Sequence, residues 1–306
     1  MEKCSDFRPV IMGAATGYSP DKVELFLNSI SRTNYTGVVT LFLNGSQITE
    51  YKDFFKKRTN YKFSLEFVNS KIGTFSSSKS ISKNFKKCIR FLSKFIVSSE
   101  PKLKKDFIYF LAPPHVSRFF DYYDYLQRNN FSHVVLTDTR DVIVQGDLNE
   151  LNQNGLFLGM EDKSLLLGKD SFHIKWISDV YGKNYLKEIA DKQISCAGVT
   201  FGDYQSMSKY LDVMINEFMS LPYYTMVRSN YDQGIHNKLL YSDAFSALHL
   251  CQPLESKIAT LGVMNVDKIN LNQDAILLNL DGTTPLFVHQ YDRHEELENI
   301  FTEKYL

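Results

Sequence analysis

Apolar runs alternate with amphipathic segments along the first part of the chain. The apolar runs have the length and composition of buried strands, and the segments between them repeat apolar residues at helical spacing. The expected elements are a strand with a small-residue loop at 8–17, a helix at 20–33, a strand at 37–44, a helix at 50–58 and a strand at 62–69. This order predicts a parallel sheet covered by helices.

The alternation continues toward the end of the chain. Further strands are expected at 106–113, 133–138, 155–160 and 195–202, and the segment 275–301 contains two strand-like runs before a C-terminal helix. Further helices are expected at 118–129, 173–190, 203–219 and 231–241. No internal repeat, low-complexity segment or linker divides the sequence. We therefore predict one α/β domain over 1–306, with a mostly parallel central sheet flanked by helices.

Residues 79–105 carry nine Lys and Arg residues around an apolar pattern. The apolar residues recur at helical spacing: Ile81, Phe85, Cys88, Leu92 and Phe95. This pattern indicates a basic amphipathic helix. Its ordinary interpretation is a helix with one solvated face, and the alternative is peripheral contact with an anionic membrane.

Composition narrows the functional classes. The chain has 306 residues, of which 43% are hydrophobic, and it carries 35 basic and 35 acidic residues. A net charge of zero gives no case for a nucleic-acid partner. The four cysteines form no CxxC pair, and this argues against a disulfide scaffold or a zinc knuckle. With no signal peptide visible and no run of about 20 apolar residues, we expect a cytoplasmic protein.

The first candidate for chemistry is the stretch VVLTDTRDVIVQGD at 134–147. An apolar run that resembles a buried strand ends in Asp138, Arg140 and Asp141. Ligands of open α/β sheets sit at the carboxyl ends of strands. Two carboxylates in a tight turn can face one point, as Mg²⁺ and Mn²⁺ sites require. A charged turn with a salt bridge to Arg140 explains the same residues.

A second polar cluster follows the apolar run PLFV, in PLFVHQYDRH at 285–294. His289 is a candidate third metal ligand, because imidazole together with carboxylates suits Mn²⁺. Arg293 and His294 are candidates for contact with phosphate oxygens. A buried histidine that only satisfies the core is the alternative for His289.

Two further segments have weaker signals. NYDQGIHNKLL at 230–240 places Asp232 and Gln233 at the start of a helix, where backbone N–H groups are free. SCAGVTFG at 195–202 has small residues that let a ligand approach the backbone. Simple helix capping and a glycine bend within a strand are the respective alternatives.

Taken together and in this order, these motifs resemble a GT-A-fold glycosyltransferase that uses a nucleotide-sugar donor. The sequence is most similar to the group that includes the family 8 retaining galactosyltransferases and bacterial and algal enzymes with a DxRDVxFQ-like motif. The resemblance covers most of the chain. It implies a nucleotide-binding half at about 1–147, and a half for the donor sugar and a glycan acceptor at about 148–306.

The resemblance also implies roles for single residues on the nucleotide side. The small residues after the first strand would line the nucleotide pocket: Ala14, Ala15 and Thr16. Arg118 would reach the donor sugar or the diphosphate. Asp138 and Asp141, with His289 as third ligand, would bind Mn²⁺ or Mg²⁺ together with the diphosphate.

On the sugar side, Ala197 and Gly198 would lie under the donor sugar. Asp232 would hold its hydroxyls, and Gln233 would lie near the anomeric carbon. The sequence departs from the family pattern in two places. The acids are spaced DxxD rather than DxD, with Arg140 at the position of the second Asp, and Cys196 stands where the family often has an asparagine.

Two other functions compete with this one. Tyrosine-rich segments such as FFDYYDY would also suit a non-catalytic carbohydrate- or nucleotide-binding protein. The segment NLDGTTPL at 279–286 resembles the nucleophile loop of haloacid dehalogenase-type phosphohydrolases. That family needs an Asp where this chain has Asn279, so the loop has no nucleophile.

Overall fold

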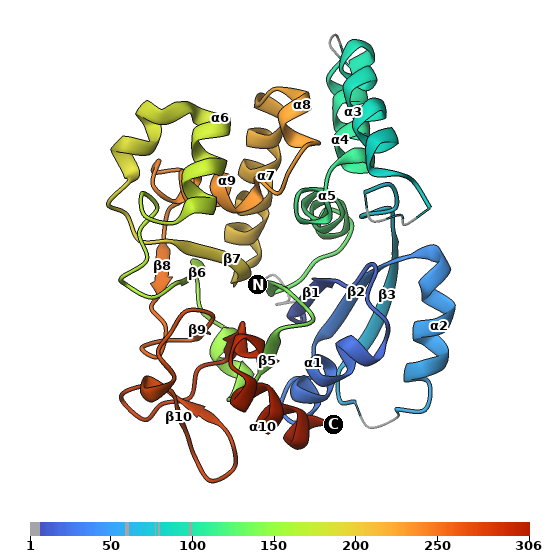
Figure 1. Ribbon diagram of the computed structural model, residues 1–306. Coiled ribbons are helices and arrows are strands. Elements are labelled where there is room, and N and C mark those ends of the chain that lie inside the picture. The colour runs from blue at the N-terminus through green and yellow to red at the C-terminus, as the bar shows by residue number, and fades with distance from the viewer. Residues whose placement is uncertain (1–6, 59–60, 77, 79, 98–99) are drawn as a thin grey trace, which may run out of the picture.

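A seven-stranded sheet forms the centre of the molecule (Figure 1). The computed structural model describes residues 7–306 except 59–60, 77, 79 and 98–99. The strands are β1 (Val10–Ala14), β2 (Val38–Asn44), β3 (Ser64–Ser70), β4 (His133–Thr137), β6 (Leu156–Met160), β7 (Ser195–Asp203) and β8 (Leu248–Cys251). Their order is β3-β2-β1-β4-β7-β6-β8, and only β7 runs antiparallel to its neighbours. The predicted α/β class with a mostly parallel sheet is confirmed.

Helices cover both faces of this sheet. The α-helices of the described residues are α1 (Asp21–Ser31), α2 (Gly45–Phe55), α3 (Lys83–Val97), α4 (Pro101–Leu111), α5 (Pro114–Leu126), α6 (Ser171–Ile189), α7 (Tyr204–Ser220), α8 (Tyr223–Met226), α9 (Asp232–Leu240) and α10 (Glu295–Tyr305). Within β1, Val10 and Met12 join the core formed with α5 and α7, whereas Ile11 joins the core formed with α1 and α2. Because both faces are buried, central strands such as β4 and β6 contain continuous apolar runs.

A second, three-stranded sheet has the order β5-β12-β9. It consists of β5 (Val142–Val144), β12 (Phe287–His289) and β9 (Ile258–Thr260), and the short strands β10 (Asn270–Leu271) and β11 (Leu277–Leu278) form a separate pair. β12 pairs with β5 in antiparallel fashion and with β9 in parallel. A core with α10 buries one face of this small sheet through residues such as Val288 and Phe301. The sheet joins the segment after β4 to the C-terminal part of the chain.

Two sequence-based predictions about the basic segment are wrong. The strand expected at 106–113 is part of helix α4, which begins at Pro101. A short apolar run does not distinguish a strand from a buried helix, and here Ile108 and Leu111 lie one helical turn apart in the core. The single helix expected over 79–105 is two helices, because proline is favoured in the first turn of a new helix. Residues 79 and 98–99 of that segment lie outside the described residues, as do residues 1–6.

None of the helices in the described part of the chain is long and apolar enough to span a bilayer.

Candidate active site

The turn between β4 and β5 places two carboxylates at one edge of the main sheet. Asp138 follows the last residue of β4, and Asp141 precedes the first residue of β5. The backbone N–H of Asp138 donates to the carbonyl oxygen of Gly198 on the neighbouring strand β7, at 2.8 Å. Since β1 and β4 are parallel neighbours, the loop that follows β1 reaches the same edge. The Thr139 hydroxyl donates to the Ala14 carbonyl oxygen at 3.1 Å and joins the two loops.

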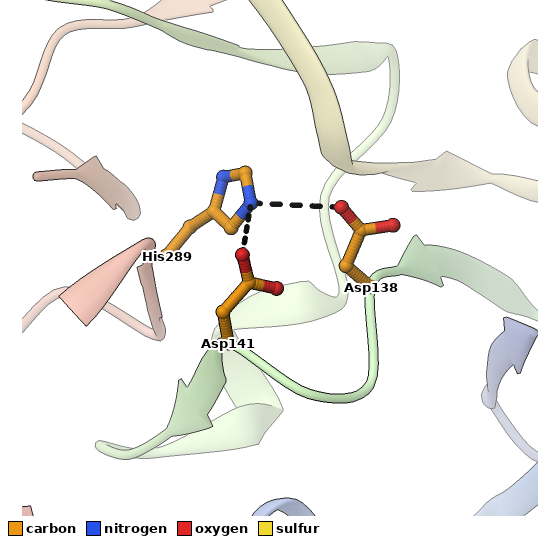
Figure 2. Close-up of side chains that lie close together, drawn as sticks. All are labelled: Asp138, Asp141 and His289. Atoms are coloured by element: carbon orange, nitrogen blue, oxygen red, sulfur yellow. Dashed lines mark ion pairs between the residues drawn. The ribbon is translucent and has the colours of Figure 1, made fainter. Parts of the chain in front are cut away.

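His289 reaches these carboxylates through the small sheet. It is the last residue of β12 and pairs with Val142 of β5. Its Nε2 atom lies 3.7 Å from Asp138 Oδ2 and 3.9 Å from Asp141 Oδ2. Dashed lines in Figure 2 mark these two ion pairs. One ligand atom from each of the three residues falls within 4.8 Å of the others. We call this group the Asp-Asp-His cluster.

The chemistry of the cluster suits a divalent cation. His289 is 1% exposed, and its Nε2 atom has no hydrogen-bond partner among the described residues. A buried polar atom without a partner is costly, and a metal ion would satisfy it. Two carboxylate oxygens with one imidazole nitrogen are a ligand set that accepts Mn²⁺. On its other side, the His289 Nδ1 atom lies 3.8 Å from Cys196 Sγ.

Burial and mutual charge shift the pKa values within the cluster. Burial would raise the pKa of Asp138, but Arg118 and His289 hold this pKa well below its usual range. Burial raises the pKa of Asp141, and the neighbouring charge of Asp138 adds to the effect. Burial would lower the pKa of His289, but Cys196, Asp138 and Asp141 outweigh it and raise this pKa well above its usual value. A cluster whose members shift one another in this way is a candidate functional site.

Arg118 connects the cluster to helix α9. This arginine projects from α5 and donates to Asp138 Oδ1, while its second terminal nitrogen lies 3.6 Å from Asp232 Oδ2. One oxygen of Asp138 therefore accepts from Arg118, and the other lies beside His289. Asp232 is buried at the first residue of α9, and burial raises its pKa.

The Gln233 side chain is held by the backbone of β7. Its carbonyl oxygen accepts from the Ala197 N–H at 3.0 Å, and its amide donates to the Ser195 carbonyl oxygen at 2.5 Å. These partners fix which end of the amide is which, because the backbone N–H can only donate and the carbonyl can only accept. Gln233 also lines a cavity beside α6.

Two cavities meet at the cluster. The β1-side cavity has a volume of about 620 Å³ and is lined by the loop after β1 and by both aspartates. The α6-side cavity has a volume of about 460 Å³ and is lined by α6, α9 and β7, and by His289. Five residues line both cavities: His115, Arg118, Asp138, Gln290 and Arg293. The Asp-Asp-His cluster therefore lies where the two cavities join.

The remaining predicted site residues lie at the end of β1, in the loop that follows it, and in β7. Ala14 and Thr16 line the β1-side cavity, whereas Ala15 is fully buried in the core with α1 and α2. Ala197 is buried and contributes its backbone N–H to Gln233. Gly198 lies directly against His289 and Asp138.

The structure shows where the two departures from the family pattern, Arg140 and Cys196, lie relative to the cluster. Arg140 pairs with Asp292 at 2.8 Å and lies 3.6 Å from Asp141 Oδ2, and Asp141 remains in the cluster. The four-residue turn brings Asp138 and Asp141 to the same histidine nitrogen despite the DxxD spacing. Cys196 is buried behind His289 and lines the α6-side cavity.

Several residues of the site were missed by the sequence analysis. Glu161 follows β6 directly, lines the α6-side cavity, and its Oε2 atom has no partner among the residues that the structure describes. Burial raises the pKa of this carboxyl. An acid directly after an apolar run is the same signal that identified Asp138, so Glu161 could have been found. His115 and His173 also line this cavity, but no motif marks them in the sequence.

Comparison with known proteins supports the fold. No protein-family model matches the sequence, and no curated protein matches it. Among solved structures, the chain is similar to an active-site mutant of LgtC in which glutamate replaces a glutamine, with a TM-score of 0.53, 12% identity, and coverage of 96% of this chain and 94% of that chain. It is also similar to the galactosyltransferase LgtC in complex with donor and acceptor sugar analogs, with a TM-score of 0.50, 13% identity, and coverage of 97% and 95%. The architecture is thus that of a GT-A-fold protein.

The contact of Gly198 with His289 generates a prediction. A Cβ atom at position 198 would overlap the His289 ring and lie 3.0 Å from Asp138 Oδ2. Gly198→Ala should therefore push His289 out of the cluster and lower the free energy of unfolding by about 1–3 kcal/mol, as expected for overpacking. Urea unfolding of the apo protein measures this. Gly45→Ala is the matched control, because the nearest atoms to its Cβ would belong to the Asn69 side chain, at 3.1 Å or more. Wild-type stability in Gly198→Ala would contradict the described packing.

Proposed function

We propose that the protein is a metal-dependent glycosyltransferase that moves a sugar from a nucleotide-sugar donor, a UDP-sugar in the first instance, to a hydroxyl group of a glycan acceptor. The observation that carries the proposal is the Asp-Asp-His cluster at the junction of two cavities, with a buried and unpartnered His289 Nε2 atom facing both carboxylates. The GT-A architecture supports this proposal, because solved structures of a galactosyltransferase share it.

The two cavities suggest how the donor would lie. The nucleoside and diphosphate would occupy the β1-side cavity, beside Thr16 and the two aspartates. The sugar would enter the α6-side cavity, beside Asp232 and Gln233. Arg293 lines both cavities and is half exposed, so its side chain can reach the phosphates at the junction.

Charge determines what the site must do during the reaction. Sugar transfer separates a nucleoside diphosphate from an oxocarbenium-like sugar, so negative charge grows on the leaving phosphate. A divalent cation bound by Asp138, Asp141 and His289 would stabilise that charge when present. Arg118 holds Asp138 in its ionised form and orients it toward His289. Arg293 would add a second positive charge on the phosphate side.

The sugar-side residues favour transfer with retention of configuration. Asp232 is engaged by Arg118, and we assign it to holding the sugar hydroxyls. The Gln233 amide is anchored on β7 and would present an uncharged group toward the reacting carbon. A neutral group at that place suits a route in which the acceptor hydroxyl gives its proton to a leaving phosphate oxygen. The proposal extends to a single domain over 1–306 and to a cytoplasmic protein.

The first test is cooperative stabilisation by UDP and Mn²⁺. If the cation bridges the cluster and the diphosphate, the two together should raise the melting temperature more than either alone. A ligand at about 100 times its dissociation constant adds roughly 2.7 kcal/mol of stability. Differential scanning fluorimetry with and without EDTA measures the effect. An equal rise in melting temperature in the presence of EDTA would show that UDP binding does not need the metal. Incubation with a panel of UDP-sugars, followed by assay for released UDP, then distinguishes an enzyme from a binding protein.

A second prediction separates the ligand role of Asp141 from a structural one. The folded state disfavours the ionised form of Asp141, since burial raises its pKa. Removing this charge should therefore leave the apo protein as stable as the wild type or slightly more so. Asp141→Asn should also abolish most of the Mn²⁺-dependent stabilisation by UDP, and His289→Ala should reproduce that loss.

The matched control for this pair is Asp292→Asn. Asp292 is a neighbouring carboxylate that pairs with Arg140 outside the cluster. Its replacement should weaken the apo protein and preserve the response to UDP and Mn²⁺. If Asp141→Asn instead weakened the apo protein and kept this response, Asp141 would belong to a turn salt bridge.

A third prediction concerns Gln233. Gln233→Ala should lower kcat much more than it weakens UDP binding, because its amide faces the sugar and not the nucleotide. It should also cost about 1 kcal/mol of stability, since the Ala197 N–H loses its acceptor. Steady-state kinetics and UDP titration give the two effects separately. Weakened UDP binding with unchanged kcat would place Gln233 on the nucleotide side.

A further inference from the structure

Helix α3 exposes its apolar side to solvent. The large apolar side chains Phe85, Phe91, Leu92, Phe95 and Ile96 are between 49 and 68% exposed, and Cys88 between them is exposed as well. Their spacing of three, four and seven residues places them on one side of the helix. Contiguous apolar surface of this kind is uncommon on soluble proteins and marks an interaction site.

The polar side of α3 faces the protein. Arg90 donates from Nε and from a terminal nitrogen to the Leu111 carbonyl oxygen at the end of α4, at 3.1 and 2.9 Å. The Ser93 hydroxyl is buried and lies 2.7 Å from the Tyr223 hydroxyl of α8. Lys86 donates to the backbone carbonyls of Ser76 and Ser78. These bonds fix the rotation of the helix, so the exposure of its apolar stripe is part of the folded structure.

The charge around this stripe has one sign. Residues 71–99 contain seven Lys and Arg residues and no Asp or Glu. Lys83, Lys87 and Lys94 are exposed on α3 itself, and by helical geometry they lie along one border of the apolar stripe. An interfacial helix on an anionic bilayer has this combination of a bulky apolar face and lysines beside it.

We propose that α3 docks the protein on an anionic membrane surface, with its apolar stripe among the lipid acyl chains and its lysines among the headgroups. In Figure 1, α3 stands at the edge of the molecule beyond α4 and α5, where a flat surface can reach it. A second copy of the chain is a poor occupant, because two acid-free, basic segments would repel each other. One stripe on a 15-residue helix is also narrow compared with the area that a stable dimer buries.

This inference goes beyond the proposed function and does not depend on it. Attachment of this kind is peripheral and reversible, and it needs no membrane-spanning helix. It would concentrate the protein at a lipid surface whether or not it transfers a sugar.

Vesicle flotation tests the proposal with the intact protein. Vesicles of phosphatidylcholine alone are compared with vesicles in which phosphatidylglycerol replaces part of the phosphatidylcholine. The wild type should float with the anionic vesicles only, and high salt should release it. Phe85→Ser/Leu92→Ser should weaken binding more than about 30-fold, because two inserted side chains are lost. Lys87→Gln/Lys94→Gln should weaken it roughly 30-fold, from the loss of two charges near the surface.

The matched controls lie elsewhere on the surface. Leu280→Ser removes a 72% exposed leucine, and Lys183→Gln/Lys187→Gln removes two exposed lysines of α6; both should bind as the wild type does. Melting curves check that each variant is folded. The proposal is overturned if the wild type ignores anionic vesicles or if Phe85→Ser/Leu92→Ser binds them normally. It is equally overturned if sedimentation equilibrium shows a wild-type dimer that this variant dissociates, since the stripe would then join two copies.

Discussion

The pairing of β5 with β12 is the contact on which the candidate site depends. Val142 of β5 is paired with His289 of β12, and this register places the histidine beside the turn that carries both aspartates. A slip of one residue would turn the His289 side chain to the opposite face of the small sheet. The core with α10 buries Ile143 and Val288 and so fixes the register. Packing in the C-terminal part of the chain therefore decides whether the N-terminal acids have a third partner.

Burial of the cluster carries an electrostatic cost that neighbouring charges offset at Asp138 and His289 but not at Asp141. Two carboxylates and an imidazole are held close together in a poorly solvated place, where buried charges need partners. Arg118 satisfies one oxygen of Asp138, and Arg140 lies 3.6 Å from Asp141. The histidine nitrogen between them is left without a hydrogen bond from the described residues. Without a cation, the folded protein is therefore less stable than it would be if these groups were satisfied. A cation bound by the cluster would restore that stability.

The sequence allowed much of this site to be predicted, because an apolar strand that ends in acids is visible without a structure. Asp138, Asp141 and His289 were identified in that way, and the structure brings them together. Strand β5 was not predicted, since its three apolar residues directly follow the charged turn. The two-cavity arrangement also could not be predicted. Residues such as His115 reach the site through tertiary packing and leave no periodic trace in the sequence.

The orientation of helix α3 could not be predicted from the sequence. Apolar periodicity identifies a helix and the stripe on it, but it does not state which side the protein will cover. The usual assumption is that the apolar side packs inward, and here that assumption is wrong. Arg90 caps the last turn of α4 and Ser93 bonds to Tyr223, and these specific polar contacts set the rotation that hydrophobic burial sets elsewhere. The exposed side chains forgo the free energy that their burial would supply, and this supports a surface that is covered from outside the chain.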